Sequence, residues 1–172
     1  MKRMRYTARG ILVDKSTKNI LLIKYIDKNS PSTIEFTEGF WVTPGGGVEK
    51  NESFKDALKR EIFEETGIQN LEIKNCIFSR IAYAKLNNNE QNMYYERYFL
   101  VETNEVIINN ENITDGEREV IKEYKWWSID ELRRTKEKVF PIGFKVFIDV
   151  KIFNYKYPVD ITDSTDILKI KV

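Results

Sequence analysis

Hydrophobic residues gather in short runs along the first part of the chain. Two of these runs, Tyr6–Asp14 and Asn19–Ile26, are rich in isoleucine, leucine, valine and tyrosine, and the polar segment Lys15–Lys18 separates them. This pattern predicts two strands joined as a hairpin. The polar stretch Asp27–Gly39 predicts a loop, which leads to a short strand at Phe40–Thr43.

A glycine-rich turn and a helix are expected next. Pro44–Gly47 should end regular structure, because proline and consecutive glycines interrupt it. Ser53, followed three residues later by Asp56, resembles a capping box with the shorter acid. Gly67 fits the left-handed position that ends helices, so we predict a helix from Ser53 to Thr66.

The second half of the chain returns to strands. Further strands are predicted at Leu71–Ala84, Tyr95–Glu102 and Tyr124–Trp127, with polar loops at Lys85–Asn92 and Asn109–Arg118. Ser128–Glu131 is a capping box that opens a short helix ending near Arg134. The spacing of apolar residues in Ile142–Asn154 suits a packed helix and also an alternating strand, and Ile167–Val172 suits an edge strand, a subunit contact or a frayed end.

This order of strands, helix, strands and helix predicts a mixed α/β sandwich. The 172 residues are 41% hydrophobic, enough for one core, and no internal repeat or low-complexity linker divides them. We therefore expect a single domain spanning residues 1–172, in which 159–172 form a tail or an edge strand.

Charge and cysteine content narrow the functional classes. The 28 basic side chains nearly cancel the 27 acidic ones, so no large field favours nucleic acid or an anionic membrane. No apolar run approaches the roughly 20 residues that span a bilayer, and Met1–Gly10 lacks the apolar core of a signal peptide. We expect a cytoplasmic protein in which the lone Cys76 is a small apolar side chain.

The chain contains no histidine. Catalytic triads built on imidazole, histidine nucleophiles and imidazole zinc ligands are therefore excluded. Any acid, base or metal site must use carboxylates, lysine, tyrosine or the thiol, which directs attention to clusters of carboxylates.

Three glutamates form such a cluster on the predicted helix. On a helical wheel, Glu61 and Glu65 fall on the inward face that begins at Phe54, and Glu64 lies beside them. Their mutual repulsion calls for a positive partner, which is either an arginine or lysine or a hard cation such as Mg²⁺ or Mn²⁺. The upstream Gly45–Gly47 allows a close backbone approach to phosphate, although three glycines alone are more often a plain turn.

Together these features resemble the Nudix box, G-x5-E-x7-R-E-U-x-E-E-x-G-U, where U is a bulky aliphatic residue. The fixed positions are filled by Gly46, Glu52, Arg60, Glu61, Ile62, Glu64, Glu65, Gly67 and Ile68. The resemblance extends to Trp41–Gly47 before the box and Trp126–Leu132 after it, and covers roughly Ala8–Leu132. Asn51, where many relatives have glycine, is a small departure, since asparagine tolerates the left-handed conformation.

The resemblance implies a Nudix α/β/α sandwich, with a mixed sheet and the box forming a loop-helix-loop. It implies hydrolysis of a nucleoside diphosphate linked to another group, as in a nucleoside triphosphate, a dinucleoside polyphosphate or a nucleotide sugar. Mg²⁺ or Mn²⁺ would be held by Glu61, Glu64 and Glu65 with a backbone carbonyl at Gly46. Glu52 and Arg60 carry over as supporting positions, and Arg60 also belongs to the catalytic set.

Residues outside the box are less constrained. Many relatives recruit a further glutamate from a loop, and Glu117, Glu119 and Glu123 all precede Trp126 at a suitable distance. We favour Glu119 among them, although each also fits a solvated loop charge. Tyr83 follows the box by the spacing seen in some dinucleoside polyphosphate hydrolases, which makes it a candidate substrate contact beside Gly45, Gly46 and Gly47.

Two rival interpretations remain to be weighed. An isoprenoid diphosphate isomerase shares the fold but uses an active-site cysteine and histidine ligands, and this chain has no histidine and an intact box. A catalytically silent Nudix-like module that senses a nucleotide or binds a partner usually loses box glutamates, and none is lost here. The sequence leaves the nucleotide substrate open, and also whether the chain forms a homodimer.

Overall fold

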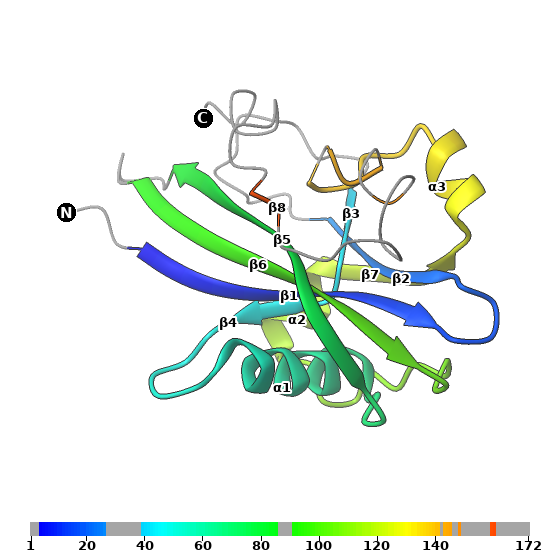
Figure 1. The fold of residues 1–172 in the computed structure, drawn as a ribbon, viewed down its shortest axis with the longest axis horizontal. Helices are drawn as coiled ribbons and strands as arrows, with labels where there is room; N and C mark the ends of the chain where they lie inside the picture. Colours follow the sequence, from blue (N-terminus) through cyan, green and yellow to red (C-terminus); the bar gives the residue numbers. More distant parts are fainter. Residues whose placement is uncertain are drawn as a thin grey trace.

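A mixed eight-stranded β-sheet organises the protein in the computed structural model (Figure 1). The structure describes residues 4–26, 39–85, 91–141, 143–145, 148 and 159–160. The strands are β1 (Met4–Asp14), β2 (Ile20–Tyr25), β3 (Phe40–Val42), β4 (Gly45–Gly47), β5 (Glu72–Lys85), β6 (Gln91–Thr103), β7 (Ile121–Trp127) and β8 (Val159–Asp160). The helices are α1 (Phe54–Thr66), α2 (Asp115–Val120) and α3 (Ile129–Arg134).

The two predicted N-terminal strands do form an antiparallel pair, but their paired region is short. β1 and β2 share only the register pair Val13↔Ile20, whereas β1 runs parallel to β6 along its whole length. Beyond that pair β1 takes β4 as its partner, and β2 takes β3 and β7. The glycine turn therefore lies beside β1 (Figure 1).

The prediction that Pro44–Gly47 ends regular structure is wrong. Gly45–Gly47 form β4, antiparallel to β1 with Ala8 opposite Gly46. Gly45 has a φ of +128°, and a Cβ there would lie 2.2 Å from the carbonyl oxygen of Ala8. Only glycine allows this close approach, so the glycines serve strand pairing as well as turning.

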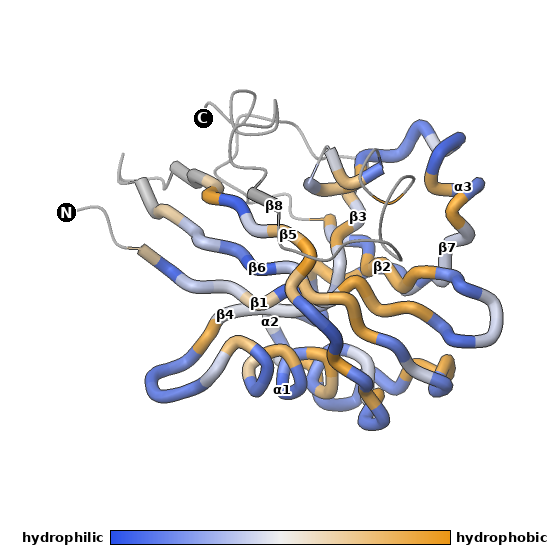
Figure 2. Tube along the Cα trace, in the orientation of Figure 1, coloured by the Kyte–Doolittle hydropathy of each residue, from blue (hydrophilic) through white to orange (hydrophobic). Residues whose placement is uncertain are grey.

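Helix α1 covers one face of the sheet, as its amphipathic sequence predicts. Ser53 caps it by accepting a hydrogen bond from the backbone N–H of Asp56, and Gly67 ends it in the left-handed conformation. Leu58 and Ile62 are fully buried against Leu12 and Val101 of the sheet. Figure 2 shows the hydrophobic run of β2 and the hydrophilic turn between β4 and α1.

The opposite face is covered by α3 and the chain that follows it. Trp41 and Trp127 pack edge to face with ring centroids 5.1 Å apart, in one core cluster with Leu132 of α3 and with Phe144. Phe144, Lys145 and Ile148 are helical, which agrees with the helix alternative for Ile142–Asn154 where that segment is described. The sandwich of helices on both faces of a mixed sheet confirms the predicted fold class.

Some boundaries differ from the predictions. The segment Asn109–Arg118, expected to be a loop, contains the start of α2, and Thr114 and Glu117 form its capping box. The pattern Thr-x-x-Glu is a sequence signal for this helix start. β6 begins at Gln91, inside the expected loop Lys85–Asn92. Residues 27–38, 86–90 and 167–172 lie outside the described part of the chain.

Two other expectations can be compared with the described residues. Cys76 is buried and unpaired, as expected for a small apolar side chain. No helix in the described part of the chain is long and apolar enough to cross a membrane.

Replacing Gly67 with alanine should destabilise the protein. Gly67 has a φ of +74°, and a Cβ there would lie 2.6 Å from the backbone oxygen of Asn109. We expect the free energy of unfolding, measured by urea denaturation, to fall by about 1–3 kcal/mol. Gly116→Ala is the matched control, because a Cβ at this helical glycine meets nothing within 4 Å. Equal unfolding midpoints for the two variants would contradict this account.

Candidate active site

Glu65 is the most deeply buried carboxylate of the predicted cluster, with 2% of its surface exposed. Its Oε2 accepts a hydrogen bond of 2.8 Å from the backbone N–H of Gly45, and its Oε1 accepts one of 2.8 Å from the Tyr25 hydroxyl. Burial raises the pKa of Glu65 to about 7, although these two donors oppose the shift. The carboxylate therefore joins α1 to both β4 and β2.

Glu61 lies directly against the glycine turn. A Cβ at Gly46 would fall 2.3 Å from Glu61 Oε2, so a side chain at this position would displace the carboxylate. The side chain of Glu61 is 13% exposed, and burial raises its pKa. Gly46 is thus the position where the backbone of β4 and a carboxylate of α1 meet.

Arg60 supplies the positive partner that the carboxylate cluster requires. It donates two hydrogen bonds of 3.0 Å to Glu52 and one of 2.9 Å to the carbonyl oxygen of Gly47. Its Nη1 also contacts Glu61 at 2.9 Å and Glu64 at 3.2 Å. These hydrogen bonds of the Arg60 guanidinium hold the turn and the helix together, and those to Glu52 lower the pKa of its carboxyl.

The donor chemistry of the site fits a hard divalent cation. Glu61, Glu64 and Glu65 offer only oxygen atoms, which Mg²⁺ and Mn²⁺ prefer. Across residues 4–26, 39–85 and 91–141, however, no three acidic or thiol groups already converge as a ready metal site. The contacts explain this, because Arg60 draws Glu61 and Glu64 toward itself while Glu65 faces Gly45 and Tyr25. Glu64 is 42% exposed and is the carboxylate most accessible to an approaching ion.

Arg9, on β1, supports the same turn and was not identified from the sequence. Its Nη1 donates a hydrogen bond of 2.6 Å to the carbonyl oxygen of Gly45 and a longer one of 3.4 Å to that of Thr43. The only signal in the sequence was an arginine within the otherwise apolar run of a predicted strand. Such a residue faces the inside of the protein when its charge is partnered.

A buried ion pair lies next to Arg9. Glu96 accepts hydrogen bonds of 2.5 Å from Arg80 and 2.8 Å from the Tyr98 hydroxyl, and its other oxygen lies 4.0 Å from Arg9. Burial alone would raise the pKa of Glu96, but the two arginines lower it below its usual value. Two arginines thus lie against one anionic carboxylate beside the turn, and the charge of Arg9 also acts on Glu61 and Glu65.

Comparison with known proteins agrees with this geometry, since residues 4–147 match the family model of the NUDIX domain. The chain belongs to the Nudix family. This match covers strands β1 to β7 and helices α1 to α3, and it includes all nine fixed positions of the box. The protein is therefore a Nudix pyrophosphohydrolase by family and by relatives.

Individual relatives support the same assignment. The RNA pyrophosphohydrolase of Pelagibacter ubique is 29% identical over 154 residues, which cover 83% of this chain and 86% of that protein. The RNA pyrophosphohydrolase of Helicobacter pylori is 38% identical over 80 residues, which cover 42% of this chain and 52% of that protein.

Solved structures share the fold. The MutT protein of Methanosarcina mazei Go1 superposes with a TM-score of 0.55 at 21% identity, covering 85% of this chain and 91% of its own. An ADP-ribose pyrophosphatase from Streptococcus suis also gives a TM-score of 0.55, at 12% identity, covering 91% of this chain and 98% of its own. At these identities the likeness concerns the fold alone.

The Nudix fold places the candidate residues outside the box unequally. Glu119 and Glu123 are exposed, whereas Glu117 is half-buried at the start of α2. The charge of Glu117 contributes to the raised pKa of Tyr25 and of Tyr124, both of which lie near Glu65. Glu117 therefore lies electrostatically closer to the box than Glu119, which the sequence favoured. The carboxylate of Glu117 also accepts hydrogen bonds from the backbone N–H and the hydroxyl of Thr114 in the capping box of α2.

The structure describes the backbone of Tyr83 on the sheet but not its side chain. It lies on β5 opposite Met93 of β6, and its side chain is outside the described part of the structure. Its expected role as a substrate contact stays a prediction.

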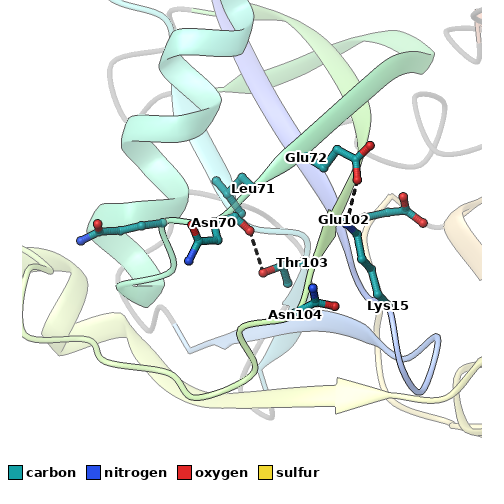
Figure 3. Close-up of a pocket in the computed structure, with 8 residues that line it drawn as sticks. Lys15, Asn70, Leu71, Glu72, Glu102, Thr103 and Asn104 are labelled. Carbon is teal, nitrogen blue, oxygen red and sulfur yellow. Dashed lines mark hydrogen bonds and ion pairs between the residues drawn. The ribbon is translucent and has the colours of Figure 1, made fainter.

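A polar cavity of about 380 Å³ lies at the opposite end of β1 from the glycine turn (Figure 3). Its polar groups contact one another: Thr103 donates a hydrogen bond of 2.9 Å to the carbonyl of Asn70, and Lys15 pairs with Glu72 at 2.7 Å. None of the box glutamates lines it. The carboxylates around Gly45 and Gly46, rather than this cavity, mark the candidate active site of the Nudix protein.

Replacing Arg60 with lysine should loosen the box, because lysine keeps the charge but cannot make the two parallel bonds to Glu52. In metal-free buffer, we expect urea denaturation to show a loss of about 1–3 kcal/mol in the free energy of unfolding. Arg134→Lys, at an exposed position of α3, should leave it within about 0.5 kcal/mol of the wild type. An equal effect of both substitutions would refute the bracing role of Arg60.

Proposed function

We propose that this chain, acting as one Nudix domain, hydrolyses a pyrophosphate bond in the 5′-terminal phosphate chain of RNA with Mg²⁺ or Mn²⁺. The observation that carries the metal-dependent chemistry is the placement of Glu61 and Glu65 against the glycines of β4, with Glu64 bound to the same Arg60 as Glu61. The names of the relatives in Pelagibacter and Helicobacter support RNA as the substrate. A 5′-triphosphate end of RNA has the same chemistry as a nucleoside triphosphate, so this proposal refines the substrate class expected from the box.

In the proposed reaction, the oxygen of a water molecule forms a bond to phosphorus while the bridging P–O bond breaks. A bound divalent ion would neutralise the phosphate charge and lower the pKa of water. Glu61, Glu64 and Glu65 would hold the ion, and the backbone of Gly45–Gly47 would let the phosphates approach closely. With no histidine in the chain, a carboxylate accepts the proton of the water.

The groups beside the glycine turn suit an anionic substrate. Arg9 and Arg80 both lie against the carboxylate of Glu96, and Arg9 is fixed by its bond to the carbonyl of Gly45. A divalent cation on the box glutamates would add positive charge beside these arginines, and together they would favour a polyphosphate over an uncharged ligand. The fold places both arginines before any ligand arrives, because Arg80 bonds to Glu96, which also accepts a bond from Tyr98, and Arg9 bonds to the carbonyl of Gly45.

A substrate panel tests the proposal. With Mg²⁺ present, 5′-triphosphorylated RNA should give a kcat/KM at least about tenfold above a nucleoside triphosphate, a dinucleoside tetraphosphate and a nucleotide sugar. The readout is the released phosphate or pyrophosphate. A higher kcat/KM on another member would reassign the substrate. Tight binding of one member without turnover of any would favour the silent, nucleotide-sensing module.

Replacing Glu64 with glutamine should lower kcat by at least about a hundredfold, because the accessible ligand loses its charge while the shape of the side chain is kept. Circular dichroism should show an unchanged fold. Glu102→Gln, at the far end of β6, is the control and should keep normal turnover. Near-normal activity of Glu64→Gln would remove Glu64 from the metal set.

The same assay can assign the glutamate outside the box. If Glu117 contributes to the site, Glu117→Gln should lower kcat more than Glu119→Gln, since only Glu117 is half-buried near Tyr25. The reverse order would restore Glu119, and unchanged rates in both would exclude a role for α2 carboxylates.

A further inference from the structure

The hydroxyl of Tyr25 is the only side-chain donor that bonds to Glu65 among the described residues. It binds Oε1 at 2.8 Å, and the N–H of Gly45 binds Oε2 at 2.8 Å. Each oxygen of a carboxylate has two lone pairs, so these bonds fix the orientation of Glu65 and still leave one lone pair on each oxygen. The buried carboxylate of Glu65 is thus held in place, and it can still accept further bonds.

Tyr25 itself is held by the strands on both sides of β2. It pairs with Phe40 of β3 on one side and with Ile121 of β7 on the other, next to a register irregularity after Lys24. Its ring also stacks on that of Phe40, with centroids 6.1 Å apart and planes 18° apart. Irregularities of this kind redirect side chains in a sheet, and here the hydroxyl points to α1.

We propose that Tyr25 is a positioning residue, which fixes Glu65 so that its remaining lone pairs can bind a divalent cation. This inference rests on the proposed metal-dependent function and adds to it a residue outside the box. Groups that hydrogen-bond to metal ligands commonly change metal affinity by 10–100-fold when they are removed. Burial strengthens the case, because a buried carboxylate without donors would be poorly placed.

Tyr124 provides an internal comparison. The charge of Glu65 helps to raise the pKa of Tyr124 to about 12, after burial, so this second tyrosine lies in the same region. However, within the described part of the chain Glu65 accepts its hydrogen bonds from Tyr25 and Gly45 and not from Tyr124. If a nearby tyrosine were enough to position Glu65, removing either hydroxyl would have the same effect. Because only Tyr25 bonds to Glu65 within the described residues, we expect the two effects to differ.

The test measures Mn²⁺ binding to the full chain at pH 8 by electron paramagnetic resonance. Tyr25→Phe keeps the ring and its stacking and removes only the hydroxyl, so the Kd for Mn²⁺ should rise about tenfold. Tyr124→Phe should leave that Kd within twofold of the wild type. In turnover assays, Tyr25→Phe should need more metal for half-maximal activation and should recover most of kcat at saturating metal.

A double-mutant cycle separates positioning from general stability. In a Glu65→Gln background, Tyr25→Phe should cause no further loss of Mn²⁺ affinity, because the group that it positions is already gone. Phe40→Leu, which removes the stacking partner and keeps the hydroxyl, should weaken Mn²⁺ binding by a smaller factor. This variant also keeps the test informative if Tyr25→Phe folds poorly.

Different failures have different meanings. Normal Mn²⁺ affinity in Tyr25→Phe, with or without a lower Tm, would overturn the positioning role alone. Additive losses in the cycle would do the same. A wild-type protein that binds no Mn²⁺, or whose binding survives Glu64→Gln unchanged, would instead overturn the proposed metal site and this inference with it.

Discussion

The separation of β1 from β2 is the constraint on which the candidate site depends. The two strands are paired at Val13 and Ile20 and then take different neighbours, which leaves room for β4 beside β1. β4 can lie so close to Ala8 only because Gly45 has no side chain. This places the N–H of Gly45 at Glu65 and the backbone of Gly46 at Glu61. The site is therefore a consequence of backbone pairing, and the carboxylates of α1 close it from one face.

Charge balance is the second constraint. Three glutamates on consecutive turns of one helix repel one another, and burial of Glu65 increases that cost. Arg60 reduces the repulsion by bonding to Glu61 and Glu64 while its other nitrogens hold Glu52 and Gly47. A divalent cation would compete with Arg60 for the same oxygens. The arginine thus stabilises the metal-free protein and leaves the carboxylates close to where a cation needs them.

The fold and the box could be predicted from the sequence where local chemistry is decisive. Ser53, Gly67 and Ser128 mark helix ends through caps that depend on only a few neighbouring residues, and the structure confirms them. The strand role of Gly45–Gly47 could not be predicted, since it depends on pairing with β1, some 36 residues earlier. Arg9 and Tyr25 were missed for the same reason: each lies in an apolar strand, and its partner is distant in the sequence.

This division between local and distant contacts has a consequence for specificity. The three box glutamates lie on one helix whose ends are set by local caps, so the sequence pattern of the box is contained in a short segment of the chain. The neighbours of the box, namely Arg9, Tyr25 and the Arg80–Glu96 pair, come from four different strands of the sheet. Because these side chains lie outside the box sequence, substrate choice can vary while the box and its reaction are kept. Groups that distinguish RNA from a free nucleotide should therefore be sought on β1, β2, β5 and β6 rather than within the box.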